Sequence, residues 1–169
     1  MFLDESRCNT DMTRRYAYSL GGSRAVDSAP LSKPKNTTIL SSIQLDGTLR
    51  YTTFSGGTTV ERFKRYLETD LLPHLNGNSV LIMDNMKSHH AKAVKNLLDS
   101  SEIRYIYLPP YSPDLNPIEK LWSKVKSFLR KFKARTLDAL PNTMQCAFQT
   151  VSPSDCSGWF HSCGYSPYF

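Results

Sequence analysis

The chain has 169 residues and a hydrophobic fraction of 40%, which suits one folded domain with a core and argues against a disordered protein. Its 21 lysine and arginine residues exceed its 15 aspartate and glutamate residues, and the net charge of +6 is compatible with a phosphate-rich partner. Because it lacks a signal peptide, a membrane-spanning apolar run and any Cys-x-x-Cys pair, we expect a cytoplasmic protein with free thiols and no membrane partner.

The first residues, Met1–Asp4, predict a strand that ends in an acid. A polar stretch over about residues 5–36 follows, with glycines and prolines that are typical of a loop insertion. Within it, Arg15–Leu20 is the one short strand candidate. We therefore expect the first strand to be separated from the next elements by a long connection.

The next elements form a hairpin and a helix. Thr37–Leu45 and Leu49–Phe54 are rich in β-branched and aromatic residues, and Asp46-Gly47 between them predicts a two-residue antiparallel turn. The threonines at 58–59 suit the start of a helix whose apolar residues recur at helical spacing until about Pro73.

The second half alternates strands and helices. Ser79–Met83 reads as a buried strand that leads directly into Asp84. A helix is predicted over Ala91–Ser100, a strand over Ile103–Leu108, and the longest helix over Pro117–Lys133.

This order of elements predicts an α/β fold in which helices flank a mixed sheet, as in ribonuclease H-like proteins. We expect a single domain, with a core over about residues 1–135 and a C-terminal tail over about residues 136–169. In that layout the ends of two neighbouring strands bring Asp4 beside Asp84, and the longest helix carries Glu119 to the same place.

Each of these acids also has a purely structural interpretation. Asp4 ends a strand, and Asp84 with Asn85 suits a turn. Glu119 stands three residues after Asn116, which is the spacing of a helix capping box. The coincidence of three acids at the expected meeting point favours a shared function.

Three ionised carboxylates in one place repel each other, by on the order of 4 kcal/mol for each pair at ~4 Å, unless cations lie between them. Mg²⁺ prefers carboxylate oxygens and retains waters, which leaves room for a phosphodiester and an attacking oxygen. We therefore expect Asp4, Asp84 and Glu119 to bind two Mg²⁺ ions, with Mn²⁺ as a substitute.

Several segments carry a family resemblance. Asp84-Asn85 followed by His89, and the block Tyr-Ser-Pro-Asp-Leu-Asn-Pro-Ile-Glu at Tyr111–Glu119, resemble the second and third catalytic blocks of mariner-type DDE transposases, including the 34 residues between the two acids. Phe2–Ser6 is similar to the first block, and Asp155–Phe160 is similar to the tail of bacterial insertion-sequence members.

The resemblance implies that Asp4, Asp84 and Glu119 bind the two ions, that the enzyme cuts DNA at transposon ends, and that a freed 3′ hydroxyl attacks target DNA. It also implies a homodimer or higher assembly on DNA, with the insertion as a place to bind a second protomer, and association with the nucleoid in a bacterium. The alternatives are a ribonuclease H-like nuclease without strand transfer and a catalytically silent DNA-binding or dimerising remnant.

Full-length members of that family carry amino-terminal helix-turn-helix modules, and here the sequence starts at the first catalytic strand. We therefore expect this DNA-reading region to be absent from the chain. An upstream-frame product is a candidate to supply it.

Polar side chains near the acids are candidates to support them, namely Asn85, His89 and Asn116. For His89, a role at a helix start or on the surface is the alternative.

Basic residues of the longest helix are candidates to contact DNA phosphates. Lys126 and Arg130 lie within about 40° of Glu119 on the helix. Lys120 and Lys124 are further candidates, with a solvated surface as the alternative.

Overall fold

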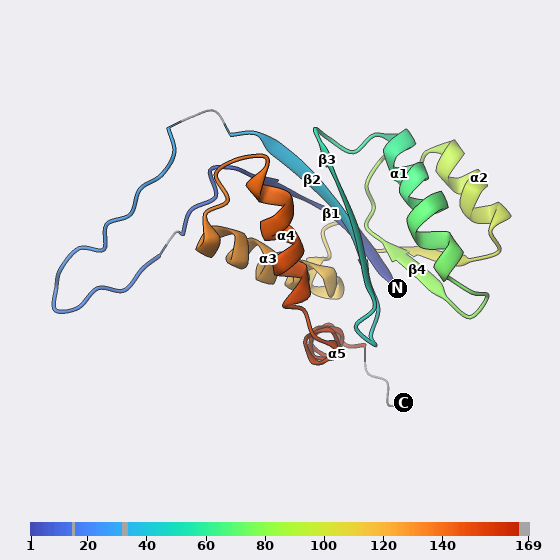
Figure 1. Ribbon diagram of the computed structural model, residues 1–169. Helices are drawn as coiled ribbons and strands as arrows, with labels where there is room; N and C mark the ends of the chain where they lie inside the picture. Colours follow the sequence, from blue (N-terminus) through green and yellow to red (C-terminus); the bar gives the residue numbers. More distant parts are fainter. Residues whose placement is uncertain (15, 32–33, 166–169) are drawn as a thin grey trace.

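The computed structural model describes residues 1–14, 16–31 and 34–165, and its centre is a five-stranded mixed sheet in the order β3-β2-β1-β4-β5 (Figure 1). β1 pairs antiparallel with β2 and parallel with β4, so the sheet changes from antiparallel to parallel pairing at this central strand. This arrangement confirms the predicted ribonuclease H-like α/β fold. The strands are β1 (Phe2–Asn9), β2 (Asn36–Ile43), β3 (Leu49–Ser55), β4 (Val80–Met83) and β5 (Arg104–Tyr107).

Helices cover both faces of the sheet (Figure 1). α1 and α2 lie on one face, and α3, α4 and α5 on the other. α1 continues through a π-helical stretch at Leu67–Leu71 into a 3-10 turn at Leu72–His74. Every helix of the described ranges is too short or too polar to cross a membrane. The helices are α1 (Val60–Tyr66), α2 (Lys92–Ser100), α3 (Ile118–Phe132), α4 (Ala139–Gln149) and α5 (Pro153–Ser162).

The alternation of side chains along β1 divides the core into two layers. Phe2 packs in the layer that contains Trp122 of α3, whereas Leu3 packs in the layer that contains Phe63 of α1. Successive side chains of a strand point to opposite faces, so the next two residues, Asp4 and Glu5, also separate. One acid of β1 therefore faces α3 and the other faces α1.

β1 is longer than predicted. It pairs with β2 over its whole length, to the Asn9–Asn36 pair, so the connection between the two strands begins after Asn9 rather than at residue 5. Ser6 is buried within this ladder, and its polarity hid the second half of β1 in the sequence. The strand predicted at Arg15–Leu20 is not seen over residues 16–20, and Arg15 lies outside the described residues.

The predicted hairpin is present, but its turn has three residues instead of two. The Gln44 N–H donates to the Thr48 carbonyl at 2.9 Å, which closes a loop over residues 45–47, and β2 ends at Ile43. Gly47 has a φ of +91°, in the left-handed region that favours glycine. The glycine of the predicted turn thus accommodates the extra residue.

The predicted helices and strands of the second half are confirmed to within two residues. Thr59 caps α1, since its side chain accepts a hydrogen bond from the Arg62 N–H. The tail beyond residue 135 folds into α4 and α5, and α4 packs against α3. Ser152 and Asp155 form a capping box at the start of α5.

Candidate active site

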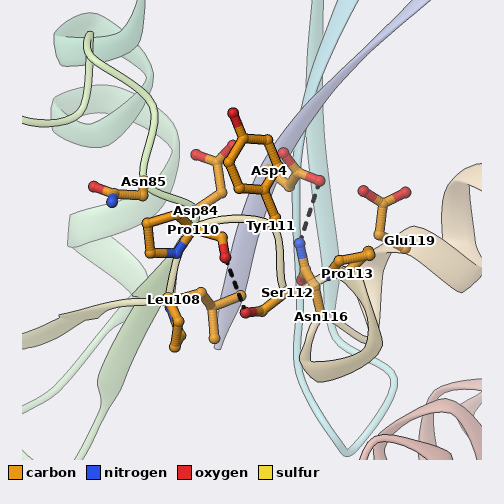
Figure 2. A pocket seen from close by; sticks show the side chains of 11 residues that line it. Asp4, Asp84, Asn85, Leu108, Pro110, Tyr111, Ser112, Pro113, Asn116 and Glu119 are labelled. Carbon is orange, nitrogen blue, oxygen red and sulfur yellow. Dashed lines mark hydrogen bonds between the residues drawn. The ribbon is translucent and has the colours of Figure 1, made fainter.

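Asp4, Asp84 and Glu119 line one pocket of about 410 Å³ (Figure 2). Asp4 lies within β1, Asp84 follows β4 directly, and Glu119 lies in the first turn of α3. In the view of Figure 2, Asp4 lies between the other two acids. The rest of the lining consists of Asn85, Leu108, Pro109, Pro110, Tyr111, Ser112, Pro113 and Asn116.

The backbone brings the acids together. In the parallel pair β1–β4, Leu3 lies opposite Met83, so the same register continued by one residue sets Asp4 beside Asp84. Glu119 reaches the pocket because α3 starts at Ile118, immediately after the proline-rich loop that forms the pocket wall. All three acids therefore sit on or directly beside regular elements.

Asp4 is only 5% exposed and is held by three donors. Its Oδ1 accepts the Glu5 N–H at 2.7 Å, and its Oδ2 accepts Trp122 Nε1–H at 3.1 Å and Asn116 Nδ2–H at 3.4 Å. Burial raises the pKa of Asp4 to about 7 against the effect of the Glu5 N–H, and the negative charge of Asp84 adds to the rise. A cation beside this carboxyl would favour its ionised form.

Asp84 is held on one oxygen. Its Oδ1 lies 2.8 Å from His89 Nδ1 and accepts the Met86 N–H at 3.2 Å. The His89 ring is completely buried, is stacked on Phe63 with centroids 4.2 Å apart, and has its Nε2 3.7 Å from Glu5 Oε1. Burial alone would lower the pKa of His89, but the hydrogen bond and charge of Asp84 outweigh it and raise that pKa.

Asn116 supports Asp4 instead of capping α3. The residue before α3 is Pro117, which makes no side-chain cap, so the capping box that would explain Glu119 structurally is not formed. The buried Asn116 amide donates to Asp4, and its Oδ1 has no hydrogen-bond partner among the residues that the structure describes. A buried acceptor without a donor is costly, and a cation beside the site would satisfy it.

Asn85 lies at the edge of the pocket. Its side-chain oxygen is hydrogen-bonded to His90 Nε2, and the His90 ring lies over Tyr107 with centroids 4.1 Å apart. Of the predicted supporting residues, Asn116 and His89 thus contact the acids, whereas Asn85 contacts a neighbouring histidine.

The donor set suits a hard divalent cation. Three carboxylates and an unpaired amide oxygen are ligands that Mg²⁺ and Mn²⁺ prefer. Within residues 1–14, 16–31 and 34–165, no three histidine, cysteine or acidic side chains are spaced to hold one ion together. A cation between these carboxylates would offset the repulsion between their ionised forms.

The basic residues of α3 separate into different surroundings. Lys126 and Arg130 line a second pocket, of about 300 Å³, together with Arg7 and Asn9 of β1. Lys120 lines a third pocket on another side of α3.

Lys124 differs from its neighbours. Its ammonium lies 2.6 Å from the Asp155 carboxylate and donates to the Thr150 carbonyl at 2.8 Å. This pair joins α3 to the start of α5 and favours a structural role for Lys124, and its contact with DNA stays a prediction.

Two contacts of the acids were not anticipated from the sequence. Trp122 packs in the core and also donates to Asp4. Glu5 faces away from Asp4 and toward His89. The available signal was strand alternation, which turns the acid next to a predicted metal ligand toward the other face of the sheet.

Comparison with known proteins agrees with this geometry. The family model described as DDE superfamily endonuclease matches residues 1–141. The Transposable element Tc1 transposase of Caenorhabditis elegans is 27% identical over 97 residues, which cover 55% of this chain and 36% of that relative.

Two solved structures share the fold. A pre-cleavage Mos1 transpososome superposes with a TM-score of 0.77 at 17% identity, over 99% of this chain and 56% of that one. A mariner Mos1 paired end complex with Mg gives 0.68 at 18% identity, over 98% and 51%. This chain therefore spans about half of the solved chains and about a third of the nematode relative. Since the family model matches most of the chain and three acids meet in its pocket, the chain belongs to the DDE superfamily endonucleases.

Proposed function

We propose that this chain is the catalytic domain of a mariner-type transposase, which cleaves DNA at transposon ends and transfers the freed strand to target DNA. The observation that carries the proposal is the meeting of Asp4, Asp84 and Glu119 in one pocket, each from a different element of a family-matched segment. The relatives named above are a transposase and transpososomes, which supports DNA as the substrate.

We propose that Asp4, Asp84 and Glu119 hold two Mg²⁺ ions, and that Mn²⁺ substitutes for them. Mos1 paired end complexes with Mg and with Mn support both ions. When bound, the ions would activate the attacking oxygen and stabilise the departing oxygen of an in-line displacement. The donors around Asp4 fix its orientation, and His89 and Met86 hold one oxygen of Asp84.

Lys126 and Arg130 are proposed to hold DNA phosphates beside the cleaved bond, because both line a pocket on the stripe of α3 that begins at Glu119. Lys120 is a further candidate at the near end of α3. Phosphate contacts of this kind position the nucleic acid and make its binding depend on salt.

The remaining proposals concern the assembly. We propose that residues 1–169 act as one catalytic domain, in a homodimer or higher assembly on the transposon ends. We also propose a cytoplasmic location, with association with the nucleoid if the host is a bacterium.

The test is nicking of DNA that carries the ends flanking the gene, with Mg²⁺ or Mn²⁺. Asp84→Asn and Glu119→Gln are expected to lower cleavage by at least about a hundredfold, because each removes a proposed ligand, while thermal unfolding shows that the variants fold. Asp138→Asn, which changes an exposed acid in front of α4, is the matched control and should cleave normally. Unchanged cleavage in both pocket variants contradicts the proposed roles of the two acids, whereas no cleavage by the natural protein favours a silent remnant.

A further inference from the structure

A chain of polar groups lies behind Asp84, on the side of the sheet that faces α1. The Thr58 hydroxyl donates to Glu5 Oε2, Glu5 Oε1 faces His89 Nε2 at 3.7 Å, and His89 Nδ1 lies 2.8 Å from Asp84 Oδ1. Three separate segments of the chain are thereby connected to one carboxylate of the pocket.

The packing leaves the His89 ring little freedom. The ring is fully buried and stacked on Phe63, and the backbone carbonyl of His89 accepts the Tyr107 hydroxyl at 2.9 Å. A 180° flip would turn carbon atoms toward both Asp84 and Glu5 in place of the nitrogens. A carboxylate on each side therefore favours one orientation of the ring.

Glu5 has no evident role in stability. Its side chain is 9% exposed, and both Glu5 Oε1 and His89 Nε2 are buried without a hydrogen-bond partner in the described parts of the chain. Burial of an acid in such a place is costly, and buried ion pairs are seldom better for stability than apolar packing. Glu5 Oε1 and His89 Nε2 face each other, so an acceptor lies opposite a nitrogen that can donate to it.

The two oxygens of the Asp84 carboxylate differ in their hydrogen bonds. Both donors to its side chain, Met86 N–H and His89 Nδ1, bind Oδ1. Among the described residues none donates to Oδ2 at hydrogen-bond distance, and the side chain is 39% exposed in the pocket. One oxygen is held by the protein and the other is free.

We propose that Glu5 is a positioning residue, which acts through His89 to hold Asp84 Oδ1 in the protein and leave Oδ2 for a divalent ion. This inference rests on the proposed metal-dependent function. It assigns to the second acid of β1 a role separate from that of Asp4, on the opposite face of the sheet.

The first test is Mn²⁺ binding to the whole chain without DNA, measured by calorimetry. Outer partners of metal ligands typically contribute 10–100-fold to affinity, so Glu5→Ala should weaken Mn²⁺ binding about tenfold. Glu5→Gln should stay within about twofold of the natural protein, since its amide oxygen can take the place of Oε1 opposite His89 Nε2. Glu68→Ala, which removes an exposed acid that pairs with Lys64, is the charge-matched control and should have no effect.

The second test uses two replacements of the same ring. Asn places an amide nitrogen near the position of Nδ1, whereas Gln places one near Nε2. Both His89→Asn and His89→Gln lose the stack on Phe63 and should unfold at similar temperatures. We expect His89→Asn to keep Mn²⁺ affinity within about threefold, and His89→Gln to lose about tenfold.

The outcomes distinguish a failure of the role proposed for Glu5 from a failure of the proposed metal site. If Asp84→Asn abolishes Mn²⁺ binding while Glu5→Ala leaves it unchanged, the inference is overturned and the proposed function stands. Equal losses in the two His89 variants, or in the two Glu5 variants, also overturn it. If Asp84→Asn binds Mn²⁺ normally, the proposed metal site itself is wrong.

Discussion

At the scale of single residues, Asp4 is the acid that most depends on its surroundings. It comes from the middle of the central strand, is almost fully buried, and accepts hydrogen bonds from Trp122 and Asn116. Burial raises its pKa from 3.8 to about 7, because the ionised form is poorly solvated there. In the absence of a cation, folding therefore favours the protonated acid.

The stability of the metal-free protein should consequently depend on pH. Because the pKa of Asp4 is higher in the folded state, its contribution to stability is complete below pH ~4 and is lost as pH rises through about 7. In EDTA we expect the free energy of unfolding to fall between pH 5 and pH 8, with a part on the order of a few kcal/mol due to Asp4. Thermal and urea unfolding at the two pH values measure this change.

Asp4→Asn is the control for that prediction. Glu5 has a pKa raised by burial as well, so some pH dependence should remain in the variant. The fall in stability from pH 5 to pH 8 should nevertheless be clearly smaller in Asp4→Asn than in the natural protein. Equal falls in both proteins contradict the account of Asp4.

At the scale of elements, the different sides of α3 contact different parts of the protein. Its first turn carries Glu119, and its buried stripe includes Trp122, which reaches Asp4. Lys126 faces the pocket near β1, while Lys124 is paired with Asp155 at the start of α5. Neighbouring lysines of one helix therefore lie in different surroundings, one beside an open pocket and one in an ion pair.

Lys126→Met and Lys124→Met test this division. Lys126→Met should weaken binding to duplex DNA and lower the slope of log affinity against log salt by about 1, because one phosphate contact is lost. Lys124→Met should keep DNA affinity within about twofold and lower the free energy of unfolding by about 0.5–1 kcal/mol. Fluorescence anisotropy at several salt concentrations and urea unfolding measure the two effects. Equal losses of DNA affinity argue against the division.

The turn of the β2–β3 hairpin lies against the start of α5. Gly47 has a φ of +91°, and a Cβ there would lie 2.8 Å from the Pro153 Cα at the start of α5. No side chain fits this position without a backbone shift, so the glycine permits both the turn and the close approach of α5.

Gly47→Ala should therefore destabilise the protein, by on the order of 2 kcal/mol or more, since strain at positive φ adds to the clash. Gly77→Ala is the matched control, because a Cβ there meets nothing within 4 Å and its φ is not positive. The midpoint of urea unfolding should fall for Gly47→Ala and stay nearly constant for Gly77→Ala. Similar midpoints for the two variants contradict this view of the hairpin.

At the scale of the whole molecule, the sequence predicted the site better than it predicted the tail. Asp84 and Glu119 each end or begin an element with a clear hydrophobic pattern, and parallel neighbours bring Asp4 beside Asp84. Family blocks then identified the same three acids. Patterns local to one element were enough here because rigid elements carry the acids.

The features that were missed depend on distant partners. Lys124 cannot be distinguished from Lys126 by position on a helix, because its partner Asp155 is 31 residues away. The far half of β1 was hidden because Ser6 is polar, yet it is buried against other elements. The pairing of Glu5 with His89 likewise joins residues from separate segments. Such contacts appear only once the chain is folded.

At this scale too, Asp4, Asp84 and Glu119 repel each other when they are ionised, unless cations lie between them. The most direct measurement is the anomalous scattering of a crystal soaked in Mn²⁺. We predict two peaks in the pocket, about 3.5–4 Å apart, that Asp4, Asp84 and Glu119 together hold. A crystal that binds Mn²⁺ without Asp4, or that leaves the pocket without a peak at millimolar Mn²⁺, contradicts the account.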